Sequence, residues 1–196
     1  PNAPTGIYES LDHVEEIIKN NPDVIVIVDE AYIDFGGETA LPLIDKYDNL
    51  VVVRTFSKSR SMAGLRIGYA ISNPELIKAL NDVKYSYNSY TMNRPSLVLG
   101  VESIHDDAYF REKVGQIIAT RERFVKEIAE LGFTCLPSSA NFVFATHESI
   151  PAKEIFAAAK ENNIYVRYFD KPRIDNYLRI SIGTDAEMDV FVSFLS

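Results

Sequence analysis

Two uninterrupted runs of β-branched and other aliphatic residues constrain the fold of this chain more than any other feature. Residues 24–28 read VIVIV and residues 50–53 read LVVV. A strand with one face in water alternates apolar and polar side chains, whereas a strand buried on both faces is apolar throughout. Each run therefore predicts a buried strand in a sheet covered by helices, and a helix between the runs favours a parallel pair. Residues 66–72 are a third strand candidate.

Apolar residues at helical spacing predict helices around these strands. Ser10 is placed to cap the first helix, and the longest helix carries its apolar residues between positions 110 and 131, with Gly132 as its C-cap. Beyond Gly132, short strand candidates alternate with helices and no long apolar run appears. This change in the pattern of elements predicts a smaller α+β unit after the long helix. We therefore expect an α/β fold with two domains, at residues 1–108 and 109–196.

The composition excludes several classes of protein. Lys and Arg total 20 against 28 Asp and Glu, a formal net charge of −8, which argues against a nucleic-acid-binding surface. The hydrophobic fraction of 46% is too high for a disordered chain. No apolar run approaches the roughly 20 residues that a membrane-spanning helix needs. Cys135 is the one cysteine, so no internal disulfide can form and we expect a reducing, cytoplasmic compartment.

Polar side chains follow the second apolar run. Lys58 lies just past its end, with hydroxyl groups at Thr55 and Ser57 and a guanidinium at Arg66. In open α/β sheets, ligands bind at the carboxyl ends of the strands, and hydroxyls with an arginine can hold a phosphate group. A lysine beside such a site can form a Schiff base with an aldehyde. A surface lysine in a serine-rich loop is the alternative interpretation.

An acidic motif follows the first apolar run. Asp29 can pair with a protonated ring nitrogen, and Tyr32, three residues on, can reach a ring oxygen. For Asp29 alone, an acid that caps the next turn is the simpler interpretation. A carboxylate, a lysine and a phosphate site together, however, are the groups that bind pyridoxal phosphate. The three histidines lack the spacing of metal ligands, so we predict no metal site.

Five segments resemble, in this order, those of the fold-type I pyridoxal-phosphate aminotransferases. They are PNAPTG, VDEAYIDF, RTFSKSRSMAGLRIGYAI, SSANFVF and YLRISIGT. DEAYIDF, RTFSK with AGLRIGY, and SANFVF are similar to the histidinol-phosphate aminotransferase branch in particular. The resemblance covers all 196 residues. It implies the later part of a cofactor-binding large domain at 1–108, with a partial, mostly parallel sheet flanked by helices, and a small α+β domain at 109–196. It also implies family segments before Pro1, so we expect an exposed sheet edge or apolar face.

The resemblance implies how these residues would hold the cofactor. Lys58 would form the Schiff base and act as the catalytic acid and base, Asp29 would bind the pyridine nitrogen, and Tyr32 would bind the phenolic oxygen. The phosphate ligands would be Thr55, Ser57 and Arg66. The family usually has an asparagine immediately before Pro-Thr-Gly that contacts the phenolic oxygen. Here that position holds Ala3, and we expect the neighbouring Asn2 to make the contact.

The resemblance also implies two arginines for the substrate. Arg179, within YLRIS, would bind the anionic end of the substrate, and Arg167 matches a family arginine near the substrate phosphate. An exposed strand charge is the alternative interpretation of Arg167. After Lys58 the sequence reads SRSM, more polar than is usual in the family, which predicts a subgroup with a shifted substrate preference.

The activity that the resemblance implies is transamination of histidinol phosphate with 2-oxoglutarate, in L-histidine biosynthesis. The partners would be these small molecules and a second copy of the chain in a homodimer. An aromatic amino-acid aminotransferase of the same branch is one alternative. A lyase similar to threonine-phosphate decarboxylase is another, and an aminotransferase-like sensor domain of a regulator is the least favoured.

Overall fold

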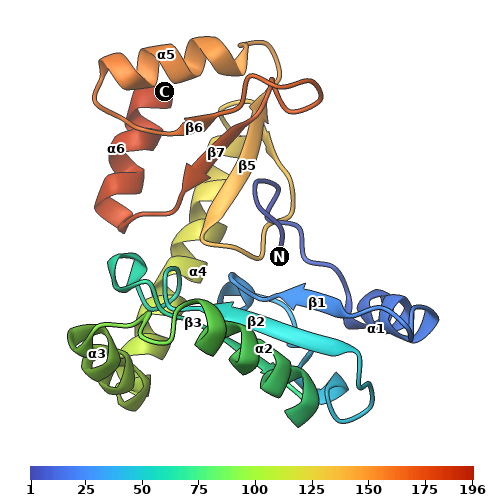
Figure 1. The fold of residues 1–196 in the computed structure, drawn as a ribbon. Coiled ribbons are helices and arrows are strands. Elements are labelled where there is room, and N and C mark those ends of the chain that lie inside the picture. The colour runs from blue at the N-terminus through green and yellow to red at the C-terminus, as the bar shows by residue number, and fades with distance from the viewer. The chain divides into compact units, whose positions relative to one another are not determined.

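The computed structural model describes all 196 residues, and they form two compact units (Figure 1). One unit is Glu9–Arg111. The other is discontinuous and combines Pro1–Tyr8 with Glu112–Ser196. No helix is long and apolar enough to cross a membrane. The assignment of residues 1–108 to a cofactor-binding domain and of 109–196 to a small domain stays a prediction.

The two apolar runs form adjacent strands in the unit Glu9–Arg111. Its sheet has the order β1-β2-β3, with β1 at Val26–Asp29, β2 at Leu50–Thr55 and β3 at Gly68–Ser72. Strands β1 and β2 are parallel, with Asp29 opposite Val53, whereas β3 runs antiparallel to β2. The predicted parallel pair is therefore confirmed, and the third strand makes the sheet mixed.

The connection from β1 to β2 differs from the α-helical crossover that the sequence led us to expect. It carries two short 3-10 helices, η1 at Ile33–Phe35 and η2 at Leu41–Leu43. Between them Gly36 and Gly37 both adopt positive φ, a conformation that favours glycine and interrupts a helix. Because these two glycines interrupt the connection, the chain reaches the parallel strand β2 without forming an α-helix.

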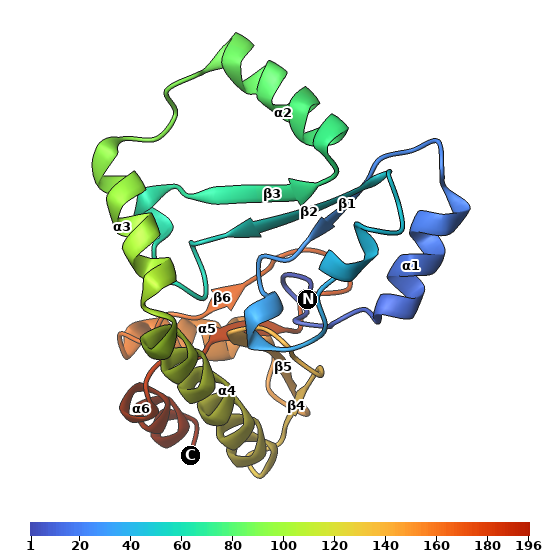
Figure 2. The ribbon, with the colours of Figure 1, turned by 90° about the horizontal axis from the view of Figure 1, so that it is seen from below.

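Three helices complete this unit. They are α1 at Leu11–Asn20, α2 at Pro74–Tyr87 and α3 at Arg94–His105. The predicted cap of α1 is confirmed, because the Ser10 hydroxyl accepts a hydrogen bond from the His13 amide. Helix α1 lies beside β1 and α2 lies beside β3 (Figure 2). The packed core lies between α1 and one face of the sheet, where Ile18, Leu50 and Val52 are fully buried.

Apolar surface remains exposed in the same unit. The prediction that the run at residues 24–28 is buried on both faces is wrong for β1, which is an edge strand with one exposed face, where 64% of Ile27 is accessible. Helix α2 buries none of its residues, and 67% of Val83 is accessible. The expected exposed sheet edge and apolar face are both present.

The second unit contains a four-stranded antiparallel sheet. Its elements are α4 at Asp107–Ala129, which begins in the first unit, β4 at Phe133–Cys135, β5 at Phe142–His147, α5 at Ala152–Glu161, β6 at Arg167–Tyr168, β7 at Leu178–Ser181 and α6 at Asp185–Leu195. The strand order is β4-β5-β7-β6, and β5 lies beside β7 (Figure 1). Phe124, Val143 and Leu178 are fully buried in its core.

Three local features of this unit bear on the sequence signals. Helix α4 ends at Ala129, so Gly132 is not its C-cap; it lies in the turn that follows the helix, where it adopts φ of +86°, a conformation that favours glycine. Thr184 and Glu187 form a reciprocal capping box at the start of α6. Cys135 is half-buried, and burial raises the pKa of its thiol to about 11, so it is a packed side chain rather than a reactive one.

The segment Pro1–Tyr8 is fixed to this unit by Gly6. The Gly6 carbonyl accepts a hydrogen bond of 2.9 Å from the Ser139 amide. Gly6 has φ of +78°, and a Cβ at this position would lie 2.5 Å from the Ser138 Oγ. Only glycine allows this close approach.

Candidate active site

The carboxyl ends of β1 and β2 bring the two predicted motifs to one edge of the sheet. Asp29 ends β1 and Thr55 ends β2, and the two strands run in the same direction. The Glu30 amide donates a hydrogen bond of 2.9 Å to the Val53 carbonyl, so pairing continues one residue beyond the end of β1. The residues after both strands therefore emerge at the same place.

The phosphate candidates lie around the end of β2. The Thr55 Oγ1 is 2.9 Å from the Ser57 Oγ and also accepts a hydrogen bond from the Ser57 amide. Thr55 donates to the carbonyl of Ile67, the residue after Arg66. Arg66 is exposed, adopts φ of +57°, and its guanidinium donates only to the Ala63 carbonyl. Two half-buried hydroxyls and an exposed guanidinium form a donor set suited to an anion.

Lys58 lies next to this donor set. Its side chain is exposed, and its Nζ lies 5.5 Å from the centre of the Tyr32 ring. Asp29 is also exposed, and its Oδ1 accepts a hydrogen bond of 2.9 Å from the Ala31 amide. Asp29 therefore caps the following turn, while its other carboxylate oxygen has no partner within the chain.

A buried ion pair beside the site was not predicted from the sequence. Glu30 is only 3% exposed, and it accepts hydrogen bonds from Arg54, from the Thr39 hydroxyl and from the Ala40 amide. Burial acts against the charged form of Arg54, but Glu30 outweighs it and the pKa of Arg54 lies above its usual value. The pair joins the ends of β1 and β2. Glu30 and Arg54 lie side by side because of the register of the two parallel strands. Aligning the two apolar runs in that register is the step that could have predicted the pair.

The two substrate candidates, Arg167 and Arg179, lie together in the other unit. They are paired residues on the antiparallel strands β6 and β7, so their side chains share one face of the sheet. Both guanidiniums lie near the Phe169 ring, at 5.5 Å and 5.9 Å from its centre. The Nε of Arg179 is buried without a hydrogen-bond partner, which is costly for a charged group. An anion beside Arg179 would satisfy it.

Asn2 also belongs to this second unit. Its side-chain Oδ1 accepts a hydrogen bond of 3.1 Å from the Thr5 hydroxyl, and its backbone closes a turn with Gly6 and Ile7. Asn2 and Ala3 are both exposed. The local bond occupies the Asn2 oxygen and leaves its amide nitrogen as the available donor.

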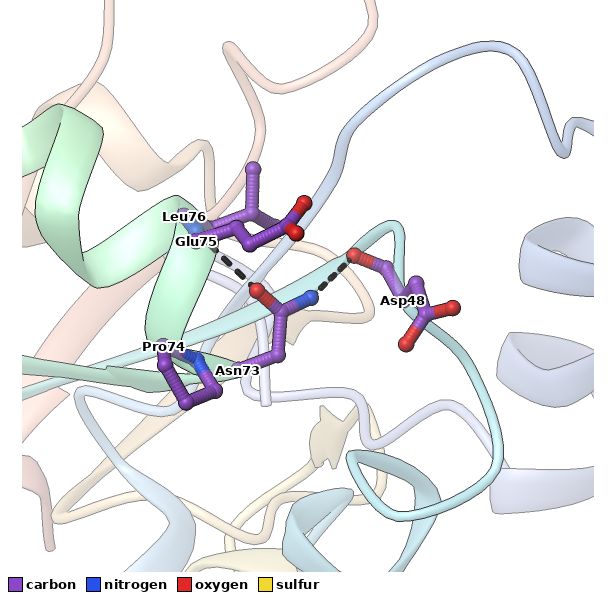
Figure 3. A pocket seen from close by; sticks show the side chains of 5 residues that line it. All are labelled: Asp48, Asn73, Pro74, Glu75 and Leu76. Carbon is purple, nitrogen blue, oxygen red and sulfur yellow. Dashed lines mark hydrogen bonds between the residues drawn. The ribbon is translucent and has the colours of Figure 1, made fainter.

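A surface pocket lies at the opposite end of the three-stranded sheet (Figure 3). It is lined by Asp48, Asn73, Pro74, Glu75 and Leu76. Asn73 caps α2, because its Oδ1 accepts a hydrogen bond from the Leu76 amide and its Nδ2 donates to the Asp48 carbonyl. None of the predicted site residues lines this pocket, and the Asn73 side chain in it is already used to cap α2 and to bind the Asp48 carbonyl. The chain contains no group of three or more His, Cys, Asp or Glu side chains that could hold a metal ion.

The residues at the sheet edge fit pyridoxal phosphate in their chemistry. An amine, a carboxylate with a free oxygen, and two hydroxyls with a guanidinium are the groups that bind its aldehyde, ring nitrogen and phosphate. Lys58, Asp29 and Arg66 are all exposed and have few partners within the chain. The cluster can therefore accept a ligand without breaking interactions of the fold.

Comparisons with known proteins agree with this chemistry. Over 193 residues the chain is 54% identical to the histidinol-phosphate aminotransferase of Brachyspira hyodysenteriae, and the match covers 98% of this chain and 54% of the relative. The chain thus spans about half the length of the curated relatives it matches.

Two solved structures have the same fold. One is a putative histidinol-phosphate aminotransferase from Erwinia carotovora, with a TM-score of 0.89 and 30% identity over all of this chain and 57% of the other. The second is the histidinol-phosphate aminotransferase of Sinorhizobium meliloti in complex with pyridoxal-5'-phosphate, with a TM-score of 0.87 and 28% identity over all of this chain and 54% of the other. Residues 1–195 match the family described as aminotransferase class I and II. The chain belongs to the class I and II aminotransferases.

Proposed function

We propose that this chain carries part of the active site of a pyridoxal-phosphate-dependent transaminase that acts on histidinol phosphate and 2-oxoglutarate. One observation carries the proposal: the amine of Lys58 lies 5.5 Å from the Tyr32 ring centre, which joins the loop that follows Thr55 and Ser57 at the end of β2 to the loop that follows Asp29 at the end of β1. Relatives named histidinol-phosphate aminotransferase, at 50–54% identity, support the choice of substrate.

Each residue would perform one task in the reaction. The bound cofactor supplies an electrophilic aldehyde and a ring that accepts electrons. Thr55, Ser57 and Arg66 would hold its phosphate and fix its position. Asp29 would keep a proton on the ring nitrogen through its free carboxylate oxygen. Lys58 would bind the aldehyde at rest and, once released, take the proton from the α-carbon of the substrate amine and return a proton later.

Arg167 and Arg179 would bind the anionic group of the substrate. A guanidinium offers a planar pair of donors to phosphate or carboxylate oxygens. The unpartnered Nε of Arg179 supports this role for that residue. Asn2 would complete the contacts to the phenolic oxygen of the cofactor through its amide nitrogen. Arg167 and Arg179 would bind the amine substrate and then 2-oxoglutarate, one after the other. The protein would act as a homodimer in the cytoplasm.

The substitution Arg179→Lys should weaken substrate binding more than it slows turnover. Lysine keeps the charge but lacks the planar fork and the Nε donor, so we expect KM for the phosphate substrate to rise about tenfold, with kcat changed much less. Steady-state kinetics measure both constants. Arg111→Lys is the control, because Arg111 is an exposed helix residue paired with Asp107. Equal KM values in wild type and Arg179→Lys would exclude Arg179 from substrate binding.

A substrate panel tests the proposed reaction itself. The full-length protein with pyridoxal phosphate should form glutamate from 2-oxoglutarate when histidinol phosphate is the amine donor. We expect kcat/KM for histidinol phosphate to exceed that for phenylalanine or tyrosine at least about 100-fold, because a site built for a phosphate rejects a donor that lacks it. A preference for the aromatic amino acids, or release of carbon dioxide from threonine phosphate, would contradict the proposal.

A further inference from the structure

The turn that carries Lys58 is tightly closed. The Ser61 amide donates to the Lys58 carbonyl at 3.0 Å, and the Met62 amide donates to the Phe56 carbonyl at 3.0 Å. Ser61 adopts φ of +55°, in the left-handed region that side chains other than glycine rarely occupy. Such a conformation persists only where the surroundings hold it in place. The contacts of the residues that follow Lys58 therefore matter.

Ser59 holds the turn on one side. It is only 6% exposed, and its hydroxyl donates a hydrogen bond of 2.5 Å to the Oδ2 of Asp34. Asp34 lies in η1, two residues after Tyr32. Helix η1 is firmly packed, since its residue Phe35 is fully buried. One hydrogen bond thus joins the loop of Lys58 to the loop of Tyr32, across 25 positions in the sequence.

Arg60 holds the turn on the other side. Its guanidinium lies 4.1 Å from the centre of the Phe110 ring and 5.5 Å from that of Phe56. It also donates a hydrogen bond to the carbonyl of Ser103 in α3. These contacts attach the turn to the helices, but they do not lead to Tyr32. The Ser59 contact, in contrast, leads to η1, which directly follows Tyr32, the residue whose ring lies beside the Lys58 amine.

We propose that Ser59 and Asp34 are a positioning pair, which holds the Lys58 amine where it can reach the cofactor aldehyde. The inference rests on the proposed function, because it concerns the lysine of that same site. A lysine side chain has four rotatable bonds, so the position of the Lys58 backbone sets the region that its amine can reach. Ser59, the next residue, holds the backbone in place through its hydrogen bond to Asp34. Asp34 in turn lies two residues after Tyr32. A small displacement of a reacting group can slow a reaction up to about 100-fold.

The experiment measures how fast pyridoxal phosphate becomes attached to Lys58 in the full-length protein. Borohydride traps the adduct at successive times, and peptide mapping quantifies it. Ser59→Ala removes the donor and Asp34→Ala removes the acceptor, whereas Asp34→Asn keeps an oxygen that can accept the bond. Ser61→Ala is the control within the same turn, because the Ser61 side chain is exposed. All rates are taken well below the melting temperature of each variant, where each is fully folded.

The pair predicts a specific pattern of rates. Ser59→Ala and Asp34→Ala should each slow attachment about tenfold or more, and the double variant should be no slower than either one, because both remove the same bond. Asp34→Asn and Ser61→Ala should stay within about twofold of wild type. If Ser59→Ala does not fold, the comparison of Asp34→Ala with Asp34→Asn decides, since Asp34 is only half-buried. Wild-type rates in both alanine variants, or equal rates in Asp34→Ala and Asp34→Asn, would overturn the positioning pair. A wild-type protein that attaches no cofactor at Lys58 would instead contradict the proposed function.

Discussion

Lys58→Ala should abolish transamination and covalent attachment of the cofactor together. Alanine has no amine to bind the aldehyde, and it cannot move a proton at the α-carbon of the substrate. General acid–base catalysis alone contributes about 10²–10⁴-fold, so we expect kcat to fall at least about 10³-fold. Glutamate formation measures the rate, and borohydride reduction followed by peptide mapping locates the labelled lysine.

Lys84→Ala is a well-matched control for this variant. Lys84 is also exposed, and its Nζ lies 5.2 Å from the centre of the Tyr85 ring, much as Lys58 lies over Tyr32. Its removal should leave both the label and the turnover unchanged. A label on any lysine other than Lys58, or full turnover in Lys58→Ala, would refute the assignment.

Asp29→Asn should reduce turnover about 10²–10³-fold, the cost typical of losing one electrostatic contact to the reacting group. The asparagine oxygen can still accept the hydrogen bond from the Ala31 amide, so the cap of the turn is kept and only the negative charge is lost. Without that charge the ring nitrogen would lose its proton, and the ring would accept electrons less readily. Retention of the cofactor should change much less than kcat, which a fluorescence titration with pyridoxal phosphate can establish.

This variant separates the two interpretations of Asp29. If Asp29 serves only as a cap, Asp29→Asn should behave as wild type in both turnover and cofactor binding. Asp23→Asn is a suitable control, because it removes an exposed charge a few residues before the same strand. Unchanged kcat in Asp29→Asn would remove this residue from the site.

Much of the fold could be predicted because its signals are local. The β-branched runs specify β1 and β2, and the caps at Ser10 and Thr184 specify the starts of α1 and α6. The prediction of an α-helix between β1 and β2 was wrong, because Gly36 and Gly37 interrupt the segment that connects the two strands.

The candidate site could be predicted only where its residues are close in sequence. Thr55, Ser57 and Lys58 lie within four positions at a strand end, so their proximity follows from the strand. The contact of Ser59 with Asp34 spans 25 positions, and no pattern within either segment indicates the partner. The shifted substrate preference that SRSM indicates stays a prediction, and the contacts of its Ser59 and Arg60 side chains with other parts of the chain could not be read from that segment. The functional roles of the predicted residues stay predictions until the variants are measured.

The discontinuous unit has a consequence for the order in which the chain folds during synthesis. Residues 9–111 contain all strands and helices of one unit, so we expect this unit to begin folding as soon as it leaves the ribosome. The segment Pro1–Tyr8 must wait, because the turn at Ser138 and Ser139 that receives Gly6 is made more than 130 residues later. Contacts between such distant positions form slowly. Until then Pro1–Tyr8 remains without its place in the fold, and it is among the last segments of this chain to acquire it.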